Sequence, residues 1–166
     1  MEAQQRRYLE RRFRARDWHG RGRRTRSAIK DFNVDGSEIR RWSLERVQRD
    51  ERAKPPVIHS MWRHGDAMNE LLAIDLFECA SVKAAHDQLL EALANMESNA
   101  IERRTDKNAP GDIAFGLNDT MVLFARANMV VLLRNAGQTI TPVSAAAREL
   151  DQVLLQRLEG KGKQRR

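Results

Sequence analysis

A cysteine and a histidine near the start of one predicted helix form the residue pair of this chain that could carry out nucleophilic chemistry. Cys79 precedes Ser81, the expected N-cap, so it lies near the positive end of the helix, where a thiol pKa falls. His86 could serve as the base, with Glu78 or Asp87 orienting its imidazole. Against this, cysteine is among the residue types most often buried, and His86 lies more than one helical turn from the cap. We favour two core residues and keep a small cysteine-dependent enzyme as an alternative.

The histidines do not have the spacing of a metal site. Only His59, His64, Asp66 and His86 could form one, and the spacing of His59 and His64 places them on opposite faces of a strand. No histidine pair has the i, i+4 spacing of helical zinc ligands. The single cysteine also excludes an intramolecular disulfide and a cysteine-rich zinc site. We therefore expect neither a metal nor another cofactor.

One arginine lies inside an apolar run, where a charged side chain needs a partner. Arg126 belongs to the extended run 121–134, and the acids available to pair with it are Asp112, Asp75 and Glu78. We expect a buried ion pair that fixes the register of the sheet. The alternative is a ligand pocket that Arg126, Asp112 and Asn128 face together.

The basic residues are concentrated at the two ends of the chain. Residues 1–30, 31–157 and 158–166 have net charges of +8, −4 and +3, which together give the +7 of the whole chain. In the first segment the arginines alternate with aromatic residues, so guanidinium groups could contact phosphates while rings stack on bases. The arginines that we expect to contact nucleic acid are Arg6, Arg7, Arg11, Arg12, Arg14, Arg16, Arg21, Arg23, Arg24 and Arg26.

A short motif within this segment points to DNA. Arg21-Gly22-Arg23 resembles the core of the AT-hook, which binds the minor groove, although Arg24 replaces the proline that normally follows. Two other interpretations remain open. Basic composition alone produces solvated, disordered tails, and an arm of this kind could also fold onto an acidic protein partner.

The periodicity of apolar residues predicts the elements that would position these side chains. A helix over 1–16 is expected only if it finds a surface to pack on, and 20–36 is expected to be an irregular linker. Asp35 and Glu38 could instead form a capping box that starts a helix, but we favour a strand from Trp42. Further strands are predicted over 57–63, 71–77, 101–105, 113–116 and 121–134, the last with a bulge or tight turn at 126–128. Helices are predicted over 82–97, capped by Ser81, and from Thr141 to Gly160.

This order of elements predicts an α+β fold. We expect a single antiparallel sheet with two main amphipathic helices packed on it, with a β-β-β-α quasi-repeat as one form of that arrangement. The expected domain spans 38–158, after a basic arm and linker over 1–37 and before a basic tail over 159–166.

The function expected from these patterns is that of a non-enzymatic binding or assembly protein whose arginines contact an anionic partner, in the first place nucleic acid. The alternative is a subunit of a protein complex whose arm becomes ordered on an acidic protein surface, and a homodimer is compatible with either. No apolar run approaches the about 20 residues that cross a bilayer, and no apolar segment follows the basic N-terminus as in a secretory signal. We therefore expect a cytoplasmic protein without a membrane span.

Overall fold

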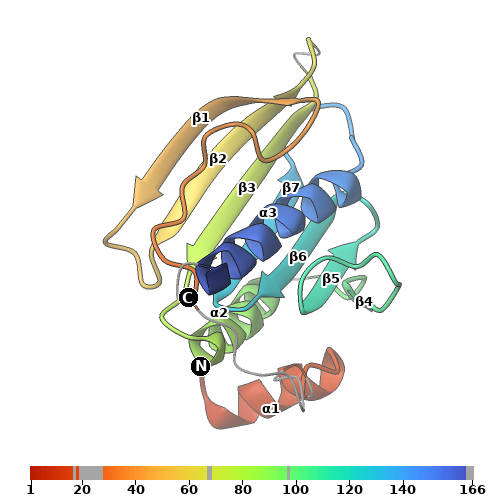
Figure 1. The fold of residues 1–166 in the computed structure, drawn as a ribbon. Coiled ribbons are helices and arrows are strands. Elements are labelled where there is room, and N and C mark those ends of the chain that lie inside the picture. The colour runs from red at the N-terminus through yellow and green to blue at the C-terminus, as the bar shows by residue number, and fades with distance from the viewer. Residues whose placement is uncertain (17, 19–27, 67–68, 97, 164–166) are drawn as a thin grey trace.

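The computed structural model describes residues 1–16, 18, 28–66, 69–96 and 98–163. Within them, seven antiparallel strands form one sheet in the order β1-β2-β3-β7-β6-β5-β4, and three helices lie on it, which confirms the α+β fold (Figure 1). The helices are α1 (Ala3–Arg12), α2 (Val82–Asn95) and α3 (Ser144–Lys163). The strands are β1 (Trp42–Asp50), β2 (Val57–His64), β3 (Leu71–Glu78), β4 (Glu102–Arg104), β5 (Ile113–Leu117), β6 (Met121–Arg126) and β7 (Met129–Asn135).

The two faces of the sheet carry two separate cores. Side chains alternate along a strand, so Val122 and Phe124 pack with α3 on one face, whereas Leu123 and Ala125 pack with α2 on the other. Residues 28–41, which we call the strap, cross the α3 face over the half of the sheet formed by β1, β2 and β3 (Figure 1). On the opposite face α2 packs on β6 and β7, and α1 packs on α2.

The order of three strands followed by a helix occurs twice, as β1-β2-β3-α2 and as β5-β6-β7-α3, and the two sets meet where β3 pairs with β7. Both helices, however, pack on β6, and they do so from opposite faces. The twofold axis that would exchange β3 with β7 is perpendicular to the sheet, so rotation about it would keep a helix on the same face of the sheet. The two halves are therefore not related by such a rotation, and the arrangement lacks the symmetry that a β-β-β-α repeat would have.

The helix caps show one correct expectation and one wrong one. Ser81 caps α2, because its Oγ accepts a hydrogen bond from the backbone N–H of Ala84 at 3.1 Å. Thr141 was expected to cap α3, but Asp119 from the β5–β6 turn does so, since its Oδ1 accepts the backbone N–H of Ser144 at 3.0 Å. The sequence therefore located this helix but did not identify the distant residue that caps it.

In the C-terminal half, the bounds of one predicted strand and of the last predicted helix differ from those in the structure. The run over 121–134 folds as a hairpin, in which Arg126 pairs with Met129 and Ala127 has a positive φ of 53°. The expected turn at 126–128 is therefore present, and it divides the run into β6 and β7. Gly160 was expected to end α3, but the helix continues to Lys163.

Side chains of the N-terminal segment pack into both cores, although a basic arm and linker over 1–37, ahead of a domain over 38–158, were predicted from the sequence. Leu9, Phe13 and Trp18 are buried in the core that α2 shares with the sheet. Phe32 and Val34 of the strap are buried in the core under α3. The expected helix over 1–16 does form, as α1, and α2 supplies the surface that so short a helix needs. None of the helices in the described part of the chain has the length and apolar character required to cross a bilayer.

Candidate functional site

The thiol of Cys79 is in an environment that keeps it neutral. The residue is 3% exposed, and burial, together with the negative charge of Glu78, raises its thiol pKa to about 12. The expected lowering of the pKa by the end of α2 is therefore overturned by desolvation. A thiol protonated at neutral pH is a poor nucleophile, and Cys79 packs as a core residue.

His86 connects α2 to α1 instead of serving a nucleophile. Its Nε2 lies 3.2 Å from Oε1 of Glu10, and its fully buried ring stacks on Trp18 with 5.0 Å between the ring centroids. Glu78 and Asp87, the acids expected to orient the imidazole, have other partners. Glu78 accepts backbone N–H groups of the strap, and Asp87 pairs with Arg6.

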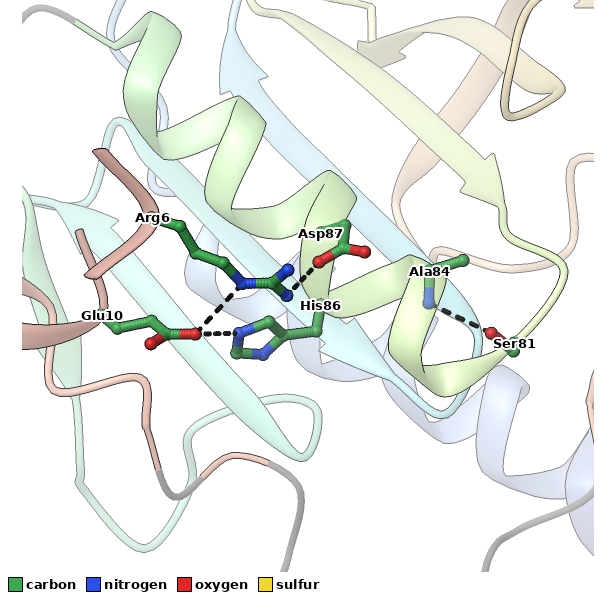
Figure 2. Close-up of polar contacts among 6 residues, drawn as sticks. All are labelled: Arg6, Glu10, Ser81, Ala84, His86 and Asp87. Atoms are coloured by element: carbon green, nitrogen blue, oxygen red, sulfur yellow. Dashed lines mark hydrogen bonds and ion pairs between the residues drawn. The ribbon is translucent and has the colours of Figure 1, made fainter. Parts of the chain in front are cut away.

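Four side chains form a polar connection between the two helices, which we call the α1–α2 clip: Arg6, Glu10, His86 and Asp87. Figure 2 shows Arg6 and Glu10 reaching from α1 toward His86 and Asp87 on α2. Burial alone would raise the pKa of Glu10, but the hydrogen bonds and charges of His86 and Arg6 outweigh it and lower that pKa. The clip and the buried apolar side chains of α1 together fix this helix on the body.

Arg126 is buried and forms ion pairs with two carboxylates. Its Nε and Nη2 donate to the two oxygens of Asp151 on α3 at 2.7 and 2.6 Å, and its Nη1 donates to Asp112 at 2.8 Å. Burial opposes the charged form, but these two acids outweigh that cost and raise the pKa of Arg126. Of the expected partners, Asp112 takes part and Asp75 does not, while Asp151 was missed. The arrangement ties α3 to the sheet.

Asn128 serves the packing of the strap. Its Oδ1 accepts the N–H of Ile29 at 2.6 Å, and its Nδ2 donates to the carbonyl oxygens of Ile29 and Cys79 at 2.9 and 2.8 Å. An open pocket of about 520 Å³ adjoins these residues. Because the amide of Asn128 is fully engaged, it offers that pocket no free donor.

The histidines considered as metal ligands are dispersed. Nδ1 of His59 lies 2.7 Å from Asp75, whose other oxygen accepts Arg134 at 2.8 Å. Nδ1 of His64 lies 2.6 Å from Glu70. Among the described residues, no three histidine, cysteine, aspartate or glutamate side chains come together as a metal site would require.

The arginines at the N-terminus are presented by a helix whose orientation is fixed. Arg6 belongs to the α1–α2 clip, and Arg12 donates to Ser98 and Asn99 at 3.2 and 3.1 Å. Arg7, Arg11, Arg14 and Arg16 are exposed, and no carboxylate among the described residues pairs with them. Arg21, Arg23, Arg24 and Arg26, with the AT-hook resemblance, lie outside the described residues.

A pocket lies between the end of α1 and β4. It has a volume of about 670 Å³ and is lined by Arg12, Phe13, Arg14, Ile101, Glu102, Arg103 and Thr105. Arg103, whose Nη1 donates to the carbonyl oxygen of Arg14, was not among the residues predicted from the sequence. Three guanidinium groups and one carboxylate thus surround the same hollow, which favours an anionic occupant.

The exposed arginines of α1 and of the turn after it, with Arg103, form what we call the basic surface: Arg7, Arg11, Arg12, Arg14, Arg16 and Arg103. Three of these arginines, Arg12, Arg14 and Arg103, line the pocket beside β4. Comparison of the chain with protein-family models, with curated proteins and with solved structures finds no match.

Proposed function

We propose that this protein binds nucleic acid through the basic surface. The observation that carries the proposal is a helix locked to the body by buried side chains while its outward arginines have no carboxylate partner among the described residues. Guanidinium groups that are not neutralised within the protein are available to phosphates, and each contact made releases counterions from the nucleic acid.

The packing of α1 and the burial of Cys79 argue against the two alternative functions, a protein-complex subunit with a free arm and a cysteine-dependent enzyme. An arm that becomes ordered on an acidic protein partner would have to be free, whereas α1 is already packed on α2. An enzyme that uses Cys79 would need a thiolate, whereas burial keeps that thiol neutral. Nucleic-acid binding requires neither, because it uses side chains that face solvent on a rigid element.

The experiment compares two triple variants of equal charge by fluorescence anisotropy with a labelled oligonucleotide over a range of salt concentrations. The first replaces Arg7, Arg11 and Arg14 with Gln. The matched control replaces three exposed arginines elsewhere, at positions 46, 52 and 148, with Gln.

Wild-type affinity should fall steeply as salt rises. If the first variant loses three phosphate contacts, its slope of log K against log salt should be smaller by about 2 to 3, whereas the control keeps the wild-type slope. Equal losses in both variants would show a response to net charge alone. Absence of salt-dependent binding in the wild type would refute the proposed function.

A further inference from the structure

Tyr8 is an exposed aromatic residue in the middle of the basic surface. It is 53% exposed, on the second turn of α1. Residues three and four positions apart are neighbours on a helix, so Arg11 and Arg12 lie beside it, and Arg7 precedes it directly. A tyrosine ring exposed among guanidinium groups combines a flat stacking surface with cations that can hold phosphates.

The other two aromatic residues of this segment are used inside the protein. Phe13 packs edge-to-face on Phe115, with ring centroids 5.6 Å apart, and the guanidinium of Arg12 lies 4.9 Å above its ring centroid. Trp18 is buried and stacked on His86. Of the three aromatic rings that the sequence placed among arginines, only Tyr8 remains open to a base.

We propose that the basic surface takes single-stranded nucleic acid in preference to a duplex, with one base stacked on Tyr8 and the flanking phosphates held by Arg7 and Arg11. The proposal rests on the proposed function and specifies its substrate class. In a duplex the base faces are already stacked on one another, so the Tyr8 ring, which approaches from outside the duplex, cannot reach them. In a single strand they are accessible, and stacking on an aromatic ring tolerates any sequence.

Stacking sets the size of the expected effect. Loss of one base–aromatic contact corresponds to a decrease in affinity of roughly five- to 150-fold. The loss should be confined to ligands that carry unpaired bases. Phenylalanine keeps the ring face, so Tyr8→Phe should bind as the wild type does.

The test measures the affinities of the wild type, Tyr8→Ala and Tyr8→Phe at one salt concentration. The probes are a 20-nucleotide oligothymidylate, a 20-nucleotide oligouridylate, a 20-base-pair DNA duplex and inorganic polyphosphate. The two oligonucleotides distinguish DNA from RNA, and polyphosphate is a polyanion without bases. Circular dichroism controls for folding, which Tyr8→Ala should preserve because the side chain is exposed and alanine favours a helix.

Tyr8→Ala should weaken binding of the single strands at least fivefold and leave binding of the duplex and of polyphosphate unchanged. An equal loss on all four probes, or no loss on any, would overturn the assignment to single strands and leave the proposed function standing. Failure of the wild type to bind any probe would instead refute the proposed function. The two failures are therefore distinguishable.

Discussion

Replacement of Arg126 by methionine tests how the sheet holds α3. The guanidinium makes three charged hydrogen bonds, two to Asp151 and one to Asp112, with both Arg126 and Asp151 buried. Arg126→Met leaves the carboxylate of Asp151 in the interior without its cation, whereas Asp112 still accepts the backbone N–H of Ala127 at 2.9 Å. Removing one member of a buried ion pair costs about 3–5 kcal/mol.

A second substitution separates the loss of the pair from the loss of packing. In Arg126→Met/Asp151→Leu both charges are gone and apolar side chains of similar volume replace them. Substitution of whole buried pairs in this way is often neutral, so the double variant should recover most of the stability that the single variant loses. For comparison, Arg63→Met breaks an ion pair with Glu45 at the surface and should cost less than about 1 kcal/mol.

The assay is urea unfolding followed by circular dichroism, with thermal unfolding as a second measurement. For a chain of this size a loss of 1 kcal/mol lowers Tm by about 2–4 °C, so Arg126→Met should lower it by about 6–20 °C. A loss no larger than that of Arg63→Met would show that the buried pair contributes little. A double variant as unstable as the single one would show that the shape of the arginine matters and its charge does not.

Two further predictions concern groups whose pKa is shifted. Because its basic partners lower the pKa of Glu10, the stability that Glu10 contributes is complete above its usual pKa near 4.5 and is lost as the pH falls through the lower folded value. The protection factors of the α1 amides, which compare their exchange with the intrinsic rate at the same pH, should therefore fall in acid, and should fall less in Glu10→Gln; an equal fall in both would contradict this. Cys79, with a pKa of about 12, should react slowly with a thiol reagent at pH 8 and rapidly in urea, and rapid reaction in the folded protein would show that the thiol is accessible.

The local elements of this fold could be predicted because each has its own pattern. Period-two runs located β1 and β3, and Ser81 identified the start of α2. The partner of Arg126 was harder to find, because Asp151 lies on another element and 25 residues away. Its neighbour Leu150 gives no guide to its position, because consecutive residues lie about 100° apart around a helix.

In the N-terminal segment, the high content of arginine made the apolar face of α1 hard to recognise from the sequence. Its charge suggested a free arm, yet Leu9 and Phe13 are spaced i, i+4 and form the buried side of α1. The strap gave no such sign, because Phe32 and Val34 have no regular period and are buried only through contacts with distant elements. Local periodicity cannot report a contact that depends on where a remote part of the chain folds. The same limit applies to Arg103, whose role depends on the position of α1.

The shared coverage of one sheet face by the strap and α3 has a consequence for biosynthesis. The backbone N–H of Arg40 donates to Glu149 at 2.6 Å, and strap residues such as Phe32 share a core with Leu150 and Leu154. These partners are translated more than a hundred residues apart, so a nascent chain on the ribosome carries an unfinished apolar face until α3 emerges. Such a face is prone to aggregation, and the native structure cannot be completed before α3 has left the ribosome.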